Sequence, residues 1–185
     1  MTAFSRRRFM AAVSAPLALV ACGNGVNSPG SQRIDARVNQ AINFMYSEVP
    51  GSETLAQRSS GMLMMPLVTE AGLGLGGAYG RGALLIDGVT VDYYSTTSAS
   101  AGLQIGAQQY SHALFFMTDR ALQDFRMSSG WVAGADLEYA VSTRRGALTT
   151  DTTTLLTPVV AVVFGQAGLI AGATVEGAKY NRIIP

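Results

Sequence analysis

The sequence predicts an α+β protein with an antiparallel β-barrel-like core and about three helices packed on its surface. Apolar residues recur at helical spacing near residue 40 and again near residue 122, whereas most of the chain consists of short apolar runs between glycine turns. Hydrophobic residues make up 48% of the 185 residues and charged residues only 14%, against about 25% in typical domains. This composition indicates one folded domain and excludes a disordered chain.

The first 21 residues predict an export signal that is separate from the fold. Residues 5–10 read Ser-Arg-Arg-Arg-Phe-Met and fit the twin-arginine pattern, and an alanine-rich apolar run follows over residues 11–21. Those eleven residues would span about 16 Å as a helix, half of a bilayer core, so they are too short to cross a membrane. Cleavage would remove Arg6, Arg7 and Arg8, so the remaining domain would have a slightly negative net charge.

Cys22, the one cysteine of the chain, is the expected site of lipidation. It ends the sequence Leu-Val-Ala-Cys, which resembles the lipobox of bacterial lipoproteins. Two or three acyl chains, at about 0.8 kcal/mol per buried methylene, would anchor the protein permanently. Residues 22–31 are polar and glycine-rich and are expected to form a flexible tether. Because Gly23 is not the aspartate that retains lipoproteins in the inner membrane, we expect an outer-membrane protein facing the periplasm.

Residues 32–185 are expected to form the domain, which begins with two helices. Apolar side chains recur at i, i+4, i+7, i+8 and i+11 over residues 31–46, the spacing of an amphipathic helix. A Pro-Gly pair breaks this helix, and residues 52–58 open a second short one that is expected to end near Gly61. The third predicted helix follows Thr118 and ends near Gly130.

Strands are predicted over the remaining apolar runs, and the first of them is expected to stop at Pro66. Asp87 and Gly88 form a strong hairpin signal between two of these strands. The predicted strands cover residues 62–65, 83–86, 89–94, 102–108, 113–117, 131–141, 159–164, 169–175 and 179–184. Residues 142–157 contain few apolar side chains and are expected to form a mobile loop.

Six glycines fall between residues 72 and 82 and could be mistaken for a dinucleotide site. Residues 72–77 satisfy G-x-G-x-x-G, and Asp92 lies 20 residues after Gly72. The motif binds a dinucleotide only where it opens a helix, and the glycines at 80 and 82 exclude one. We therefore expect strands here whose backbones approach closely or bend sharply.

The inventory of reactive side chains argues against catalysis, a metal or a cofactor. A lone cysteine cannot form an internal disulfide, and His112 is the one imidazole of the chain. Ser111 precedes it, but neighbours on a strand point to opposite faces, so we expect a structural histidine. A hydrolase that uses a pair of carboxylates is the third hypothesis. The candidate residues are Asp87, Asp92, Asp136 and Glu138. The net charge of +1 predicts no binding to nucleic acid.

Basic side chains near the end of the chain are the candidates for contact with anionic lipid head groups. Arg144 and Arg145 are adjacent in the predicted loop and are the preferred pair. The other candidates are Arg120, Arg126 and Lys179. The alternative interpretation of these residues is a solvated surface without a ligand.

Several segments together resemble the SYLF-domain family. They are residues 76–85 (GGAYGRGALL), 92–95 (DYYS), 102–108 (GLQIGAQ), 114–118 (LFFMT), 151–154 (DTTT), 163–169 (VFGQAGL) and 176–179 (EGAK). The resemblance extends over about residues 33–185. It implies a β-barrel core with surface helices and a lipid-binding module without known catalysis. Eukaryotic members bind phosphoinositides and take part in membrane and actin organisation, whereas bacterial members are often exported lipoproteins.

The resemblance and the export signal together predict a tethered, non-catalytic lipoprotein whose domain binds membrane lipid. Lipid binding by eukaryotic members is associated with a basic N-terminal helix. The predicted helix 31–46 holds two basic residues, Arg33 and Arg37, so specificity for phosphoinositides is not expected. The alternative function is an envelope structural or assembly factor that binds a protein partner.

Overall fold

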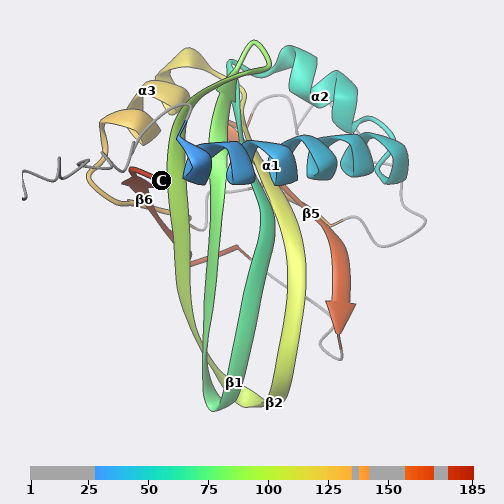
Figure 1. The fold of residues 1–185 in the computed structure, drawn as a ribbon, viewed down its shortest axis with the longest axis vertical. Helices are drawn as coiled ribbons and strands as arrows, with labels where there is room; N and C mark the ends of the chain where they lie inside the picture. Colours follow the sequence, from blue (N-terminus) through green and yellow to red (C-terminus); the bar gives the residue numbers. More distant parts are fainter. Residues whose placement is uncertain (1–27, 135–137, 142–156, 169–174) are drawn as a thin grey trace, which may run out of the picture.

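The computed structural model describes residues 28–134, 138–141, 157–168 and 175–185, and it confirms the α+β fold. The three helices surround a curled sheet that forms a half-barrel (Figure 1). The elements are α1 (Pro29–Glu48), α2 (Ser52–Arg58), β1 (Gly61–Ile86), β2 (Val89–Phe116), α3 (Asp119–Met127), β3 (Trp131–Val132), β4 (Glu138–Val141), β5 (Val159–Gly168) and β6 (Lys179–Ile183).

Strands β1 and β2 form one long antiparallel hairpin that replaces several predicted short strands. Its turn is the predicted Asp87-Gly88 pair, whose φ angles of 49° and 76° match the left-handed conformations that a tight hairpin requires. The prediction that Pro66 ends the first strand is wrong. The pairing register shifts between Met65 and Val68, and at this irregularity the missing N–H of proline costs no ladder hydrogen bond.

The hairpin bends back on itself, and the glycine-rich segment makes this possible. Both ribbons turn at the end of the hairpin far from the helices (Figure 1), and the register shifts between Leu73 and Leu75. The two halves of β1 then approach closely. A Cβ on Gly80 would lie 2.8 Å from Cγ2 of Val68, and one on Gly82 would collide with the carbonyl of Met64. The expected close approach is confirmed, and the segment is strand rather than the start of a helix.

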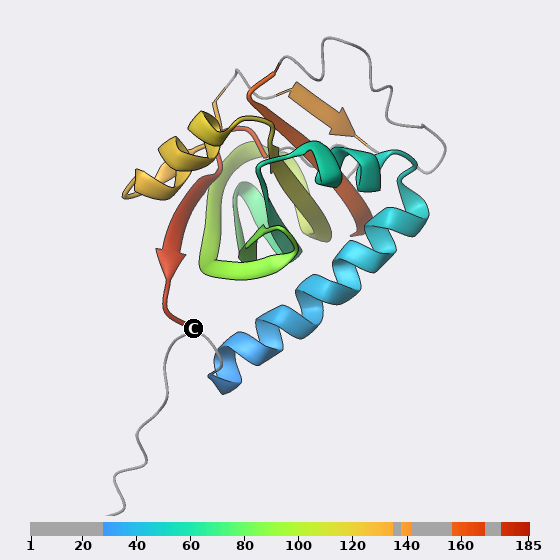
Figure 2. The same ribbon diagram turned by 90° about the horizontal axis from the view of Figure 1, so that it is seen from above.

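The sheet curls because the two halves of β2 carry different neighbours. The strand order is β3-β6-β2-β5-β4, and β1 also pairs with β2. Strand β6 pairs with the first half of β2, from Tyr93 to Thr97, whereas β5 pairs with the second half, from Gln108 to Phe116. The pairs are antiparallel except for β4 with β5, which are parallel. The curled sheet is visible from above in Figure 2.

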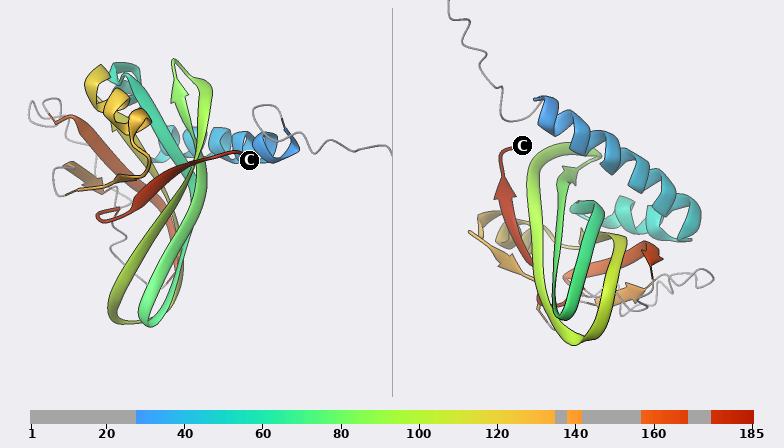
Figure 3. Two further views of the ribbon diagram at one scale, coloured as in Figure 1. Left: turned by 90° about the vertical axis from the view of Figure 1, so that its left-hand side faces the viewer. Right: turned by 60° about the horizontal axis from the view of Figure 1, so that its bottom comes forward.

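Helices cover both faces of the sheet, and each face has its own hydrophobic cluster. Phe125 of α3 packs with Phe116 and Tyr180 on one face. Val38 and Met45 of α1 and Leu55 of α2 pack on the other face, with side chains that include Phe115 and Val162. Alternation along each strand sends neighbouring side chains to opposite clusters. Figure 3 accordingly shows α1 and α3 on opposite sides of the sheet.

The helix boundaries follow local capping signals. Ser28 caps α1 by accepting a hydrogen bond from the Ser31 amide, so the helix begins before the predicted residue 31 and includes residues 29–31 of the expected tether. The Ser28 hydroxyl also donates to the carbonyl of Pro185 at 3.2 Å, which places the C-terminal end beside the start of α1 (Figure 2). Thr118 caps α3, as predicted.

Other predictions at the end of the chain are confirmed in part. The predicted strand 131–141 consists of the two short strands β3 and β4. Residues 142–156 and 169–174 lie outside the described residues. The structure therefore tests the expected loop 142–157 only at Thr157 and the expected strand 169–175 only at Val175. None of the helices in the described part of the chain is long and apolar enough to cross a membrane.

Candidate functional site

The basic residues chosen from the sequence do not gather into one site within the described residues. Arg120 is almost fully exposed on α3 and lies 3.8 Å from the Asp124 carboxylate. Arg126 forms an ion pair with Asp92 at 3.3 Å, and Arg182 forms a second with the same carboxylate at 2.8 Å. Nearby carboxylates therefore already compensate Arg120 and Arg126.

The remaining lipid-site candidates are only partly described. Lys179 lies on β6, with its Cε beside Gly130. Cys22, Arg144 and Arg145 lie outside the described residues, and so does the signal segment. Lipidation and the preferred arginine pair therefore stay predictions.

His112 is a buried structural side chain. Its Nε2 lies 2.8 Å from the hydroxyl of Tyr180, and its ring packs beside Tyr110. Burial lowers the pKa of His112 to about 3, so the imidazole is neutral at ordinary pH. Ser111 instead donates its hydroxyl hydrogen to the carbonyl of Pro66 at 2.7 Å. The two neighbours therefore do not form a nucleophile and base pair.

The carboxylates of the hydrolase hypothesis are described in part. Asp87 is exposed in the hairpin turn, and Asp92 binds two arginines. Asp136 lies outside the described residues, and the side chain of Glu138 is not described. Within the described part of the chain, no cluster of three or more His, Cys, Asp or Glu could hold a metal ion.

A cavity of about 340 Å³ lies between the first half of α1 and the middle of β1. Two of its arginines, Arg33 and Arg37, are one helical turn apart on α1, and Arg81 comes from β1. Its lining residues are Gly30, Arg33, Ile34, Arg37, Pro66, Leu67, Thr69, Tyr79, Gly80 and Arg81. The residues of β1 come from both of its halves, so the bend of the hairpin assembles this cavity.

The three arginines of this cavity form no ion pair within the described residues, although the carboxyl group of Pro185 lies beside the lining residue Gly30. The guanidinium groups of Arg33, Arg37 and Arg81 are exposed, and none forms an ion pair or a hydrogen bond within this part of the chain. No acidic side chain lines the cavity. Guanidinium groups bind phosphate and carboxylate through paired hydrogen bonds, so this end can hold an anion.

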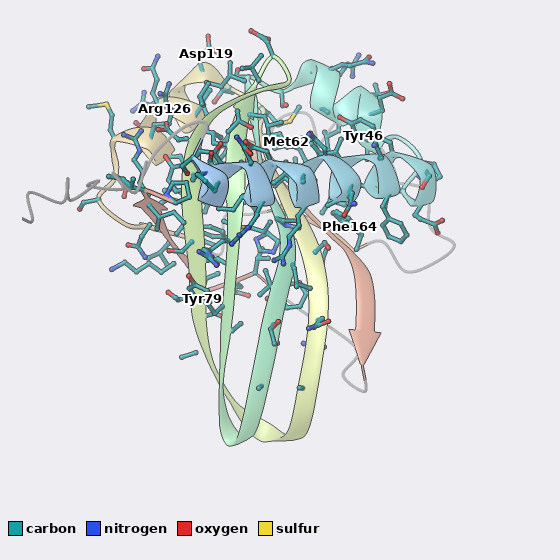
Figure 4. The ribbon with its side chains drawn as sticks, in the orientation of Figure 1. Tyr46, Met62, Tyr79, Asp119, Arg126 and Phe164 are labelled. Carbon is teal, nitrogen blue, oxygen red and sulfur yellow. The ribbon has the colours of Figure 1, made fainter. Side chains whose placement is uncertain are left out.

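A second cavity of about 460 Å³ continues along α1 and is mainly apolar. It shares Arg37, Pro66 and Leu67 with the first cavity, so the two form one groove, named here the α1 groove. Its other lining residues are Gln40, Ala41, Phe44, Ser111, Phe164 and Gly165. In Figure 4 the labelled Tyr79 and Phe164 lie below α1, towards its opposite ends.

The apolar end of the α1 groove exposes large hydrophobic side chains. Phe44 is 46% exposed and stacks on Phe164 with ring centroids 6.3 Å apart, and Leu67 is 39% exposed. Gly165 has φ of 62°, and a Cβ there would lie 3.5 Å from the Phe44 ring. The position favours glycine because other residues rarely adopt this conformation. The groove thus joins a cationic end to an apolar one.

Sequence reasoning missed most of this groove. It noted Arg33 and Arg37 but gave them no site, it quoted Tyr79 and Arg81 only within the family resemblance, and it gave Phe44 no role. The i, i+4 spacing of the two α1 arginines is a local signal that places them on one helix face. Nothing in the local sequence brings Arg81 to them, because this depends on the bend of β1.

Comparison with known proteins finds a family match in the second half of the domain. The Ysc84 (SYLF) family, described as a Las17-binding protein actin regulator, matches residues 97–182. This segment is similar to the SYLF family. The expected SYLF resemblance is thereby confirmed, and the family is one of lipid-binding or actin-regulating domains. No curated protein matches the chain.

The family match covers only part of the α1 groove. Ser111, Phe164 and Gly165 fall within the matched segment of the SYLF domain. Arg33, Arg37 and Arg81 precede it. The match alone therefore assigns no role to the three arginines, and their role must be argued from their geometry and charge.

Proposed function

We propose that the protein is a non-catalytic envelope lipoprotein whose SYLF domain binds an anionic lipid in the α1 groove. The observation that carries this proposal is the combination of three exposed arginines without an ion pair at one end with exposed Phe44 and Leu67 at the other. Lipids of this kind have the same two parts, an anionic head group and apolar chains. Head-group contacts and chain burial would both contribute to binding.

Each end of the groove favours one part of such a lipid for a different physical reason. Charge-assisted hydrogen bonds from Arg33, Arg37 and Arg81 would replace the water around a phosphate, and no carboxylate in the lining would repel it. Burial of apolar chain against Phe44 and Leu67 contributes about 25 cal/mol for each Å² removed from water. The cationic end alone would not distinguish a lipid from a soluble anion. The apolar end alone would not distinguish a lipid from a neutral detergent.

The predicted anchor supports a membrane source for this lipid. Six peptide units separate Cys22 from Ser28, and a chain of that length reaches about 20 Å when fully extended. Ser28 caps α1, and Gly30, two residues further on, lines the cationic end of the groove. Lipidation of Cys22 would therefore hold this end within about 20 Å of the head groups in the same leaflet.

Vesicle binding by the mature chain, with Cys22→Ser to remove lipidation, tests the proposal. Vesicles of phosphatidylethanolamine with phosphatidylglycerol provide an anionic surface, and vesicles of phosphatidylcholine provide a neutral control. We expect binding to the anionic vesicles only. Arg33→Glu, Arg37→Glu and Arg81→Glu combined should weaken it at least tenfold.

A matched variant separates the α1 groove from the basic residues chosen from the sequence. Arg120→Glu, Arg144→Glu and Arg145→Glu combined change the net charge by the same amount and should leave binding within about twofold. If this variant loses binding and the α1 groove variant keeps it, the lipid contacts lie at the predicted loop instead. If neither vesicle binds the unchanged domain, the lipid function itself is wrong.

A protein partner remains the second candidate, and one surface favours it. A cavity of about 430 Å³ lies between α3 and β3, on the side of the sheet opposite α1. Near it Val132 is 53% exposed, and Met127 at the end of α3 is 86% exposed. An envelope partner bound there should crosslink to a photoreactive residue at position 132 and not to one at position 67. Crosslinking at neither position would contradict this function.

A further inference from the structure

The apolar surface of the α1 groove restricts the lipid that it can bind. The two ends of the groove are open to solvent, so their volumes of about 340 and 460 Å³ set no sharp limit on the ligand. Phe44 and Leu67 are the large hydrophobic side chains that the described residues expose at the apolar end. Arg37, Gln40 and Ser111 are the polar side chains of the same end. The exposed apolar surface therefore offers contact to one acyl chain, and polar groups lie beside it.

Packed side chains prevent the apolar end from deepening to enclose a second chain. Phe164 beneath Phe44 is 2% exposed and belongs to the core cluster of α1 and α2. A Cβ on Gly165 would already touch the Phe44 ring at 3.5 Å and the Ser111 hydroxyl at 3.6 Å. The groove therefore cannot deepen without disturbing packed side chains, and such rearrangement is costly in a close-packed interior.

We infer that the ligand of the α1 groove is a single-chain anionic phospholipid, with its phosphate at Arg33, Arg37 and Arg81 and its acyl chain against Phe44 and Leu67. This inference rests on the proposed function and narrows it. A diacyl lipid would leave its second chain in water whenever the protein is not at a membrane. A monoacyl lipid would place its one chain against Phe44 and Leu67, so the domain could hold it away from a bilayer.

Two lipids with equal numbers of chain carbons and the same head group test this inference. The probes are palmitoyl lysophosphatidylglycerol and dioctanoyl phosphatidylglycerol, both kept below the concentrations at which they form micelles. Isothermal titration calorimetry and native mass spectrometry of the mature Cys22→Ser chain give affinity and stoichiometry. We expect one palmitoyl lysolipid per chain, bound at least tenfold more tightly than the two-chain lipid.

The dependence of affinity on acyl-chain length is a second test, because a site that binds only the head group would show no such dependence. Affinity should rise with chain length from the lauroyl to the palmitoyl lysolipid, by up to about fourfold for each added methylene that the groove buries. Phe44→Ala should weaken the palmitoyl lysolipid at least fivefold. Met127→Ala, on an exposed side chain of α3, is the matched control and should change nothing. Glycerol phosphate alone should bind weakly and equally to all three proteins.

The outcomes separate this inference from the proposed function. Equal or tighter binding of dioctanoyl phosphatidylglycerol, or affinity independent of chain length, would overturn the single-chain ligand and leave lipid binding intact. Binding of glycerol phosphate as tightly as the lysolipid would identify a soluble phosphate ligand and would overturn the inference. No binding of either lipid or of anionic vesicles would overturn both.

Discussion

Acidification should destabilise the domain through His112, although this residue lines neither end of the α1 groove. The imidazole is 1% exposed, its Nε2 meets the hydroxyl of Tyr180, and its Nδ1 has no hydrogen-bond partner within the described residues. Burial lowers the pKa of His112 to about 3, whereas an unfolded chain has the ordinary value of about 6.5. Between these values the unfolded state binds the proton more readily than the folded state.

The sign and the size of the effect follow from this difference. Stability is fully present above pH 6.5 and is lost as the pH falls towards 3, because the unfolded state gains a proton that the folded state excludes. A fall from pH 7 to pH 5 costs about 2 kcal/mol, since each pH unit below the unfolded pKa contributes about 1.4 kcal/mol. A loss of this size is a large part of the stability of an ordinary domain.

Urea unfolding at pH 7 and pH 5 measures this loss. The matched control is the double variant His112→Phe and Tyr180→Phe, which replaces both hydrogen-bonding partners by apolar groups of similar shape. Wild type should lose about 2 kcal/mol more than the control over this interval, because the control cannot take up the proton. Equal losses in the two proteins would refute the reasoning. So would an imidazole of folded wild type that titrates near pH 6.5 by NMR.

Four further substitutions test the packing of the domain. Gly82→Ala should destabilise the domain by about 3 kcal/mol or more, because its Cβ collides with the backbone of the other half of β1. Gly77→Ala, which meets one atom at an ordinary 3.6 Å, should be within about 1 kcal/mol of wild type, and equal urea midpoints for the two variants would contradict the close approach. Tyr93→Phe removes the 2.8 Å hydrogen bond to Asp35 of α1 and should cost about 2 kcal/mol, with faster hydrogen exchange in α1 and not in α3. Thr118→Ala removes the cap of α3 and should lower stability by about 1 kcal/mol in thermal unfolding, whereas no change would mean that the cap contributes nothing.

Features that depend on neighbouring residues could be predicted from the sequence. Thr118 predicts the start of α3 because its hydroxyl accepts a hydrogen bond from an amide in the first turn. Asp87-Gly88 predicts the hairpin because few other residue pairs adopt the φ angles of its turn. The glycines between residues 72 and 82 indicated close approach of backbones, which the structure places at Gly80 and Gly82.

Features that depend on distant pairing could not be predicted. Pro66 would end an isolated strand, but it lies at a register shift between β1 and β2, so the strand continues past it. Arg81 reaches the cavity of Arg33 and Arg37 only because β1 folds back against itself under α1. Arg126 looked available for a lipid, but Asp92 meets it from a strand far away in sequence. Each outcome needs the tertiary fold, which spacing in one sequence does not contain.

The bent hairpin also gives the chain a favourable order of folding. Pairing can start beside the Asp87-Gly88 turn and extend outwards, so Gly61 meets Phe116 without the closure of one large loop. Strand β6 has no such route, because Lys179 must find Thr97 across most of the domain. We therefore expect the hairpin to form early and β6 to join late. The α1 groove needs the two halves of β1 already folded together, so ligand binding should report the completion of folding rather than its beginning.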